Sequence, residues 1–552
     1  MTVSHSDLCE LLKKEMTLGE LEVYLPSIKC EVKATIGDEI TLELNSDRPD
    51  MLSVEGVVRA LRSFMEMKTG PQKIMAKKGP VNVKVLASTE KVRPFIACSI
   101  LRGIKLSDEI VRQMMQLQEK LHETYCRNRR KASIGIYDLD RVSPNIIYEA
   151  VSPGKISFVP LDANEKMSGT EILERTDKGI RYAPIIKQLR VYPLLRDENG
   201  IVLSMPPILN SEDTRVTSLT EDLFIDVTGL DERLVNSVNN ILIYNLALRG
   251  GNPEIVSIKY STGRKIATPL LKPTEMTMNI DYANQTLGLS MGAGSMTRLL
   301  RRAGHSAKPI DGRKIRVLIP PYRCDILHQI DLVEDVVMSY GFNNLTPELP
   351  STATVGKELA ISTLTRTARE IMVGFAFQEV LNYILSNKNI LCTKMKREAD
   401  NLIEISNPMS MEYHMLRDSL IPGLLNYLSF NRHVQYPQKI FECGDVIGYA
   451  PKSSPRTLRK LAAVICNYKA SFEEVQSIAY TTFKTLNLKH WSIEGSHHPS
   501  FIDGRSAQIR TEDAEIAILG EIHPEVLKNF ELENPVVALE INMTELLTQS
   551  EE

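Results

Sequence analysis

Apolar residues recur with two different periods near the N-terminus, and each period predicts a different element. Ile40, Leu42 and Leu44 occupy alternate positions of ITLELN, which is typical of a strand with one buried face. The segment VEGVVRALRSFM then places its apolar residues at helical spacing. Turn-forming residues, NSDRPD, separate the two. We therefore expect an α/β segment over residues 1–67.

Two stretches of the chain, each between segments with a regular apolar pattern, show no hydrophobic periodicity. Residues 68–80 are basic and contain glycine and proline, and residues 348–359 (ELPSTATVGKEL) lack an apolar stripe, so both are expected to be linkers. Residues 81–268 combine short strand patterns with a long amphipathic helix that begins after Ser107. This mixture predicts a large α+β domain.

The remaining patterns predict two further domains. Residues 269–346 contain two short helical patterns, the strand KIRVLIPP and an acidic helix, which together describe a small domain. Residues 356–552 alternate helices with strands. Because 552 residues exceed what one hydrophobic core usually supports, we expect an α+β multidomain protein.

Composition restricts the class of protein. With 43% hydrophobic and 24% charged residues the chain is typical of globular proteins, and its apolar runs are far shorter than the roughly 18 residues that cross a bilayer. We expect a cytoplasmic protein without a membrane partner. Eight scattered cysteines show no metal-binding spacing and are expected to be reduced thiols.

Charge is nearly balanced, which argues against a whole-surface electrostatic contact with nucleic acid. The formal net charge is −3, so any contact with RNA must be local. Two basic clusters, RNRRK at 127–131 and LRR at 300–302, are candidates for phosphate contacts. Runs of this kind more often form solvated faces, and the sequence leaves both interpretations open.

The stretch RCDILHQIDLVEDVVMSYGF concentrates carboxylates beside a valine-rich stripe. Asp331, Glu334 and Asp335 share one helix face at i, i+3 and i+4, and Asp325 lies just upstream. These acids can complement the positive end of the helix dipole, or they can bind a hard cation. All candidate ligands are oxygen, so magnesium fits better than zinc. Spacing alone leaves both interpretations open.

With its neighbours, this stretch resembles a known family. RVLIPPYRCDILHQIDLVEDVVMSYGFNNL is similar to the signature of the phenylalanyl-tRNA synthetase beta-subunit family. The motifs LNSDRPDMLSVEGVVRALR, IGIYDLD, PPILNSEDTRVT, LFIDVTG, and LRDSLIPGLLNYLSFNRH with KIFECGDVI resemble that family in the same order. The resemblance covers nearly the whole chain. The length of the chain is similar to that of the archaeal and eukaryotic type of this subunit.

The resemblance implies an enzyme subunit. In this family the beta chain pairs with a catalytic alpha subunit in an α2β2 tetramer that attaches L-phenylalanine to tRNA(Phe) using ATP. Residues 269–346 are then a small winged-helix-like domain, and Asp325, Asp331, Glu334 and Asp335 are implied magnesium ligands. Residues 356–552 resemble a class II synthetase domain without catalytic motifs and are expected to dock the alpha subunit.

The resemblance also implies that residues 81–268 form an editing domain that hydrolyses mischarged Tyr-tRNA(Phe). The implied editing-pocket residues are Ser204, Asn210, Asp226, Thr228, Gln118 and Arg129. Asp226 or Asn210 can hydrogen-bond to a phenolic hydroxyl, and Arg129 can steady the tRNA terminus. With no Ser-His or Cys-His pair evident, we expect a positioned water to attack.

Three alternatives stay open. Asp226 and Thr228 can instead be turn residues before Gly229, with Asn210 and Ser211 shaping a loop. The chain can be a non-catalytic scaffold that binds only the alpha subunit and tRNA. It can also be a free-standing nucleic-acid-binding protein built on the small domain.

Overall fold

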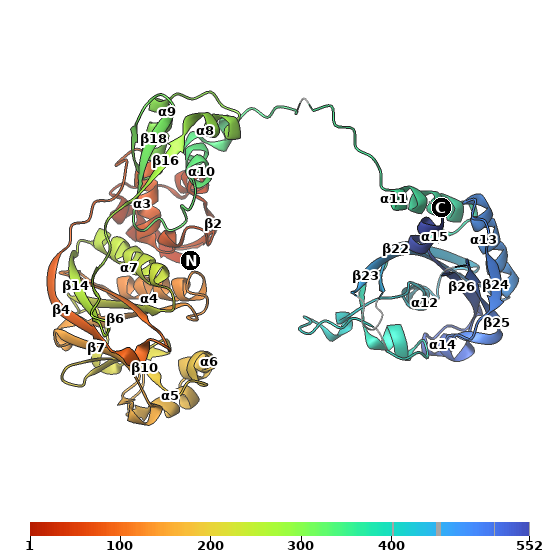
Figure 1. Cartoon of the computed structure of the whole chain (residues 1–552), viewed down its shortest axis with the longest axis horizontal. Coiled ribbons are helices and arrows are strands. Elements are labelled where there is room, and N and C mark those ends of the chain that lie inside the picture. Colours follow the sequence, from red (N-terminus) through yellow and green to blue (C-terminus); the bar gives the residue numbers. More distant parts are fainter. Residues whose placement is uncertain (351, 400–401, 449–453, 513, 551–552) are drawn as a thin grey trace. The chain divides into compact units, whose positions relative to one another are not determined.

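The structure is a computed structural model that divides the chain into two compact units, Met1–Leu349 and Pro350–Glu552 (Figure 1). It describes residues 1–350, 352–399, 402–448, 454–512 and 514–550. The last two residues of the expected C-terminal domain, 551–552, lie outside that range. The described residues between Asn344 and Ala360 form no helix or strand, so the break between units falls in the second expected linker.

The N-terminal segment is a small α/β layer. Its elements are β1 (Thr2–Ser4), β2 (Cys30–Ile36), β3 (Glu39–Leu44), α1 (His5–Leu12), α2 (Leu18–Tyr24) and α3 (Val54–Phe64), with antiparallel strands in the order β1-β3-β2. Ile40 and Leu42 are buried, and the Ser53 hydroxyl caps α3. The strand and helix predicted from the two apolar periods are confirmed.

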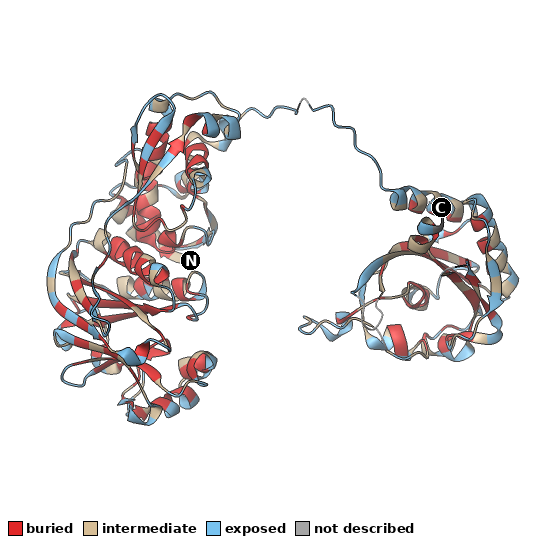
Figure 2. Cartoon of the chain, viewed as in Figure 1, coloured by how far each residue is buried: buried red, intermediate tan, exposed pale blue. Residues whose placement is uncertain are grey.

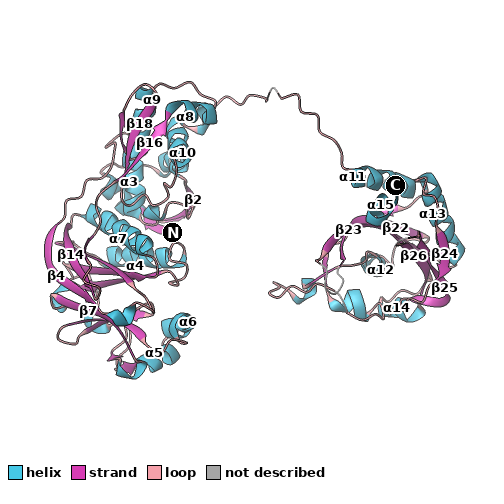
Figure 3. Ribbon diagram, in the orientation of Figure 1, coloured by secondary structure: helices cyan, strands magenta, loops and turns pink. Residues whose placement is uncertain are grey.

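A ten-stranded sheet forms the centre of the first unit (Figure 3). Its path runs through β12 (Leu209–Asn210), β11 (Val202–Met205), β10 (Tyr192–Asp197), β7 (Asn145–Val151), β4 (Lys77–Val85), β14 (Asn252–Tyr260), β5 (Phe95–Arg102), β13 (Leu223–Gly229) and β6 (Ala132–Asp138), and β15 (Lys265–Thr268) pairs with β14. Two long helices, α4 (Asp108–Glu123) and α7 (Glu232–Leu246), share an apolar core with β5, β6 and β13. Ser107 caps α4 as expected. A separate core joins β10 and β11 to α5 (Gly169–Arg175), α6 (Asp177–Ile186) and the short pair β8 (Ser157–Phe158) and β9 (Met167–Ser168).

Side chains cover the outer edge of β6, where the strand path ends. The Ile134 N–H donates to His122 Nε2 at 2.9 Å, and Gln118 Nε2 donates to the Ile134 carbonyl at 2.8 Å. Asn210 Nδ2, from the opposite end of the path, lies 3.5 Å from the Ile136 carbonyl. An edge strand is thereby satisfied without another strand, and the two ends of the sheet enclose a space.

The small domain packs three helices against a three-stranded antiparallel sheet. Its elements are β16 (Thr274–Asn279), β17 (Ser306–Pro309), β18 (Lys314–Ile319), α8 (Ile280–Leu287), α9 (Ala293–Arg302) and α10 (Gln329–Tyr340). The expected apolar side of α10 is buried. Arg301 donates to the Ala307 carbonyl, and Arg302 donates to the carbonyls of Phe64 and Ser339. Both arginines of the LRR cluster are therefore bonded to backbone carbonyls of the fold, although Arg301 itself is exposed.

The second unit is built on a seven-stranded sheet with helices on both faces. The strand order is β19 (Gln378–Glu379), β22 (Gln438–Gly448), β23 (Arg456–Cys466), β27 (Val536–Asn542), β26 (Glu515–Ile522), β25 (Phe501–Arg510) and β24 (Ser492–Gly495). One face packs on α11 (Ala360–Gly374), α13 (Phe472–Thr485) and α15 (Met543–Ser550), and the other on α12 (Ile421–Phe430) and α14 (Pro524–Asn529). The remaining pair is β20 (Leu385–Ser386) with β21 (Met415–Leu416).

Buried residues lie on both faces of the middle strands of this sheet, and Figure 2 colours buried residues red. Along β23, Leu461, Ala463 and Ile465 contact one helical layer, while Ala462, Val464 and Cys466 contact the other. This is the two-residue period of a strand between two cores. The chain is therefore a mixed α/β multidomain protein, as predicted. No helix in its described part is both long and apolar enough to cross a bilayer.

Candidate active site

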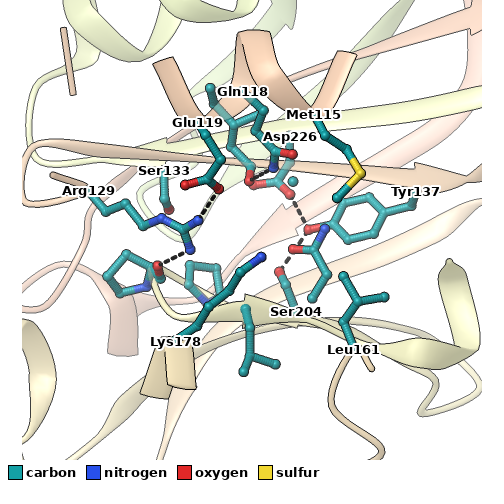
Figure 4. Close-up of a pocket in the computed structure, with 16 residues that line it drawn as sticks. Met115, Gln118, Glu119, Arg129, Ser133, Tyr137, Leu161, Lys178, Ser204 and Asp226 are labelled. Atoms are coloured by element: carbon teal, nitrogen blue, oxygen red, sulfur yellow. Dashed lines mark hydrogen bonds and ion pairs between the residues drawn. The ribbon is translucent and has the colours of Figure 1, made fainter. Parts of the chain in front are cut away.

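A cavity of about 260 Å³ lies in the space enclosed by the ends of the central sheet (Figure 4). Five of the six residues expected in an editing pocket line it: Gln118, Arg129, Ser204, Asn210 and Asp226. They come from α4, the loop that follows it, β11, β12 and β13, so the fold brings together side chains from distant parts of the chain. Their chemical roles stay predictions.

Asp226 is buried in the middle of β13, diagonally across from Tyr137 on β6. The Tyr137 hydroxyl donates a hydrogen bond to Asp226 Oδ1 and lies 2.8 Å from Ser204 Oγ. A phenol has one proton, so when that proton goes to Asp226 the Ser204 hydroxyl must donate to the phenolic oxygen. Tyr137 was not among the predicted site residues, although it belongs to the motif IGIYDL.

The ionisation of Asp226 is tuned by its surroundings. Burial raises the pKa of Asp226 to about 7, against the opposing effects of the Tyr137 hydrogen bond and the Arg93 charge. The carboxyl group therefore changes charge near neutral pH. Its second oxygen, Oδ2, makes no hydrogen bond within the described part of the chain. A hydroxyl group that enters the cavity would find an available partner there.

Gly135 keeps this end of the cavity open. A Cβ atom at this position would lie 1.9 Å from the Tyr137 hydroxyl oxygen and 2.3 Å from Asp226 Oδ1. Both distances are far below van der Waals contact, so any side chain here would displace the hydrogen-bonded pair. Gly135 also belongs to the motif IGIYDL and was not among the predicted site residues.

Thr228, the sixth expected residue, is not among the residues that line the cavity. Its hydroxyl accepts a hydrogen bond from Arg93 Nε at 3.1 Å and lies 3.0 Å from Ser133 Oγ. Arg93 also donates to the Thr228 carbonyl at 2.8 Å. Since β13 runs from Leu223 to Gly229, the alternative that Asp226 and Thr228 are turn residues is wrong. Thr228 supports the wall of the cavity from behind.

Arg129 is buried and bound by protein acceptors. Its guanidinium donates to the Ile208 carbonyl at 2.7 Å and to Glu119, and stacks 4.5 Å from the centre of the Tyr182 ring. It therefore holds the segment around Pro207, which also lines the cavity. In this structure Arg129 positions the wall, while its Nε makes no hydrogen bond within the described residues. A contact of Arg129 with a tRNA terminus stays a prediction.

Glu119 and His122 form a second polar group at the cavity. Burial lowers the pKa of His122 to about 4, so the imidazole is neutral; its Nε2 accepts from a backbone N–H, which leaves the proton on Nδ1, facing Glu119. Burial alone would raise the pKa of Glu119, but the His122 hydrogen bond and the Arg129 charge lower it to about 2. Lys178 on α6 also lines the cavity and forms no ion pair within the described residues. While Asp226 is protonated, Glu119 is the one charged carboxylate beside Arg129 and Lys178 in the described lining, which favours an anionic ligand.

The four carboxylates of the acidic stretch bind different partners. Arg323 holds Asp325 through Nε at 2.9 Å and Nη2 at 2.7 Å, and its Nη2 also lies 2.8 Å from Asp335. Asp331 accepts from the N–H groups of Leu327 and His328 at 2.7 and 2.8 Å, and Glu334 pairs with Lys29 at 2.8 Å. The protein's own cations and backbone donors thus relieve the repulsion for which we expected a metal.

These residues do not fit the predicted magnesium site. Within the described residues, no group of three or more potential ligand side chains is arranged to hold a metal ion. Burial alone would raise the pKa of Asp335, but the Arg323 charge and the His305 hydrogen bond hold it well below its ordinary value. Asp331, in the first turn of α10, matches the interpretation of complementing the helix end. Magnesium binding stays a prediction.

Comparison with known proteins identifies the family. Residues 345–543 match the family described as the phenylalanyl tRNA synthetase beta chain CLM domain, and residues 276–342 match the tRNA synthetase B5 domain. The phenylalanine-tRNA ligase beta subunit of Archaeoglobus fulgidus is 40% identical over 94% of both chains. That of Methanocaldococcus jannaschii is 38% identical over 98% of this chain and 99% of its own.

A solved structure supports the same assignment. An N-terminal fragment of the phenylalanyl-tRNA synthetase beta subunit from Pyrococcus horikoshii superposes with a TM-score of 0.60 at 36% identity, covering 62% of this chain and 99% of the fragment. The curated relatives match along nearly their whole length, so the likeness is not limited to one domain. The chain therefore belongs to the phenylalanyl-tRNA synthetase beta-subunit family.

Proposed function

We propose that this chain pairs with a catalytic alpha subunit in an α2β2 phenylalanine-tRNA ligase, and that its central cavity removes tyrosine from mischarged Tyr-tRNA(Phe). The complex attaches phenylalanine to tRNA(Phe) with ATP, and aminoacylation takes place in the alpha subunit. The observation that carries the hydrolytic role is the buried Asp226, one of whose oxygens is held by Tyr137 while the other is available in the cavity.

The cavity suits discrimination by a hydroxyl group. A site shaped for phenylalanine rejects tyrosine only modestly by bulk, whereas a site that hydrogen-bonds a phenol rejects the analogue that lacks it much more strongly. A phenylalanine side chain would leave Asp226 Oδ2 desolvated and unpaired, which costs about 1–3 kcal/mol or more. Tyrosine would satisfy that oxygen. The same group can therefore select the wrong product and spare the correct one.

Water is the proposed nucleophile. Gln118 Nε2 is occupied by the Ile134 carbonyl, which leaves the Gln118 amide oxygen as an acceptor for a water molecule. Lys178 lines the cavity without an ion pair in the described chain, so its ammonium group can contact the phosphate of the terminal nucleotide. Placing the ester between these groups would orient the attack without a covalent intermediate.

The finer domain assignments belong to the same proposal. The second unit, residues 356–552, is proposed to dock the alpha subunit with a class II-like sheet that lacks catalytic motifs, and residues 269–346 are proposed to be winged-helix-like. The helix-flanked sheet of the second unit supports the first assignment. No step of the hydrolysis is assigned to magnesium, because the four candidate carboxylates do not form a ligand set within the part of the chain that the structure describes.

Deacylation of Tyr-tRNA(Phe) by the purified α/β complex tests the proposal. Asp226→Asn and Asn210→Ala should each reduce the deacylation rate at least tenfold while phenylalanylation is kept. Asp213→Asn, an exposed carboxylate on the same domain, is the matched control and should change neither rate. A wild-type complex that charges tRNA but does not deacylate Tyr-tRNA would favour the scaffold alternative. A monomer that binds RNA and does not assemble on co-expression with the alpha subunit would favour the free-standing RNA-binding alternative.

A further inference from the structure

The loop of residues 127–131 divides its basic side chains between two cavities. Arg129 lines the candidate active site, whereas Arg127 and Lys131 line a second, more open cavity of about 460 Å³. Arg130 lines neither of the two. The run RNRRK is therefore not one uniform basic face, because neighbouring residues have separate positions and separate partners.

Three cations surround the second cavity. The three are Arg127, Lys131 and Arg233, the last of which lies in the first turn of α7. None of them forms an ion pair with a carboxylate in the described chain. Asp231 is the one carboxylate in the lining, and its Oδ1 accepts the Leu234 N–H at 2.9 Å as the cap of α7. The cavity therefore carries an excess of positive charge that the described residues do not neutralise.

A hydroxyl group and a helix end add to the preference for anions. Ser46 lines the cavity and supplies a hydrogen-bond donor of the kind that contacts phosphate oxygens, whereas the Thr124 hydroxyl already donates to the Lys120 carbonyl at 2.6 Å and the Tyr125 hydroxyl is hydrogen-bonded to Cys324 and Ser237. The cavity also includes Asp231, Arg233 and Leu234 at the N-terminus of α7, the end of a helix that favours negative charge. The site therefore combines a hollow, three cations, one neutral donor and a helix N-terminus.

The loop backbone is held in place. Arg127, Asn128 and Arg129 have φ values of 50°, 51° and 63°, a left-handed conformation that costs roughly 1–2 kcal/mol per residue. Backbone hydrogen bonds at both ends hold it, from the Arg127 N–H to the Thr124 carbonyl at 3.0 Å and from the Lys131 N–H to the Cys126 carbonyl at 3.1 Å. The unusual turn is what separates Arg129 from Arg127 and Lys131.

We propose that the second cavity binds phosphodiester groups of an RNA strand. The inference rests on the proposed function, because it supplies a contact for the tRNA whose aminoacylated end occupies the first cavity. Contacts to phosphate hold the strand in register without reading its sequence, so the loop would anchor the backbone with Arg127 and Lys131 and shape the hydrolytic cavity with Arg129.

The salt dependence of tRNA binding tests this assignment. Affinity of the α/β complex for a tRNA(Phe) transcript is measured at a series of salt concentrations for wild type, Arg127→Gln/Lys131→Gln, Arg233→Gln and Arg130→Gln. The slope of log K against log[salt] is negative, and each lost phosphate contact should reduce its magnitude by about 1. The double variant and Arg233→Gln should therefore bind more weakly with a smaller slope. Arg130→Gln removes one positive charge from the same loop, as many as Arg233→Gln removes from the cavity, and should behave as wild type.

Other ligands predict other outcomes. If the cavity variants and Arg130→Gln weaken binding equally, the effect is one of net charge and the site is overturned. If the cavity variants lose binding of inorganic phosphate but keep wild-type affinity for tRNA, the ligand is a free anion and the RNA assignment fails. If they weaken assembly with the alpha subunit and leave the slope unchanged, the cavity is a protein interface and the RNA assignment also fails.

The inference and the proposed function can fail separately. Wild-type deacylation of Tyr-tRNA(Phe) tests the proposed function, and the binding slope tests the second cavity. Deacylation with no change of slope in the cavity variants rejects the second cavity alone. A complex that does not deacylate, but whose tRNA binding depends on Arg127, Lys131 and Arg233, rejects the hydrolytic role and supports the phosphate site.

Discussion

The hydroxyl group of Tyr137 donates a hydrogen bond to the carboxylate of Asp226 on the neighbouring strand of the central sheet. This contact occupies one carboxylate oxygen and favours the charged form of a group whose burial favours the neutral form. Asp226 consequently changes charge close to the pH at which an enzyme works. The behaviour of the cavity should therefore depend on Tyr137 as well as on Asp226.

Replacing Tyr137 with phenylalanine should shift the pH dependence of deacylation upward. The substitution removes the hydrogen bond that lowers the pKa of Asp226. The carboxylate form, which accepts a hydrogen bond from the phenol of the substrate, therefore appears only at higher pH. The measurement is kcat/KM for Tyr-tRNA(Phe) from pH 5.5 to 8.5, divided by the uncatalysed rate. In an Asp226→Asn background the same substitution should produce no shift, and a shift there would contradict the explanation.

Asp226 should also make folding stability depend on pH. Its pKa is raised from 3.8 to about 7 in the folded chain, so the folded state holds a proton that the unfolded state releases between these values. Its contribution is fully favourable below 3.8 and is lost as the pH rises through 7, by ~4 kcal/mol in all. The stability of Asp226→Asn relative to wild type, measured by thermal unfolding, should therefore increase between pH 4 and pH 8. Asp213→Asn should show no such trend.

Gly135→Ala should abolish deacylation without abolishing phenylalanylation. The added methyl group would displace the Tyr137 hydroxyl and the Asp226 carboxylate, which lie 1.9 and 2.3 Å from its ideal position. Gly154→Ala in the same domain is the control, since no heavy atom of the described residues lies within 4 Å of a Cβ atom there. Equal deacylation by the two variants would show that the cavity does not need the space that Gly135 leaves.

Local periodicity was sufficient to predict much of the fold. Alternation at Ile40 and Leu42 predicted a strand, and the residues after Ser107 predicted a capped helix, because both signals are contained within one element. The cavity depends on pairing between distant strands. Gly135 and Tyr137 share one face of β6, but only the register with β13 brings that face to Asp226. A single sequence contains no signal for that register.

Charge clusters were harder to interpret from sequence because their partners lie far along the chain. RNRRK gives no indication that three successive left-handed residues turn Arg129 inward while Arg127 lines another cavity. The acids of α10 have the helical spacing that was expected, yet Lys29, which neutralises Glu334, is contributed by the N-terminal segment. Spacing locates the acids, whereas tertiary contacts decide what neutralises them.

Arg129→Gln should destabilise the first unit by about 3 kcal/mol, as expected when a buried cation is removed from its carboxylate and carbonyl partners. The loss would leave Glu119 with less compensation and would release the carbonyl of Ile208. Thermal unfolding of the full chain measures the effect. Arg130→Gln, one residue along and exposed, should change the transition by less than about 0.5 kcal/mol. Similar losses in both variants would contradict a structural role for Arg129.

Chelation should distinguish a metal from an arginine as the partner of Asp335. Arg323 and His305 bind Asp335 at 2.8 and 2.6 Å, so Asp335→Asn should destabilise the chain by about 3 kcal/mol whether or not magnesium is present. Glu334→Gln, on the same helix, removes a half-exposed ion pair with Lys29 and should cost only about 0–1 kcal/mol. Because protein groups already compensate these acids, adding EDTA should leave the thermal transition of the wild-type chain unchanged. A large decrease on chelation, reversed by magnesium and absent in Asp335→Asn, would instead establish the metal site that the resemblance implies.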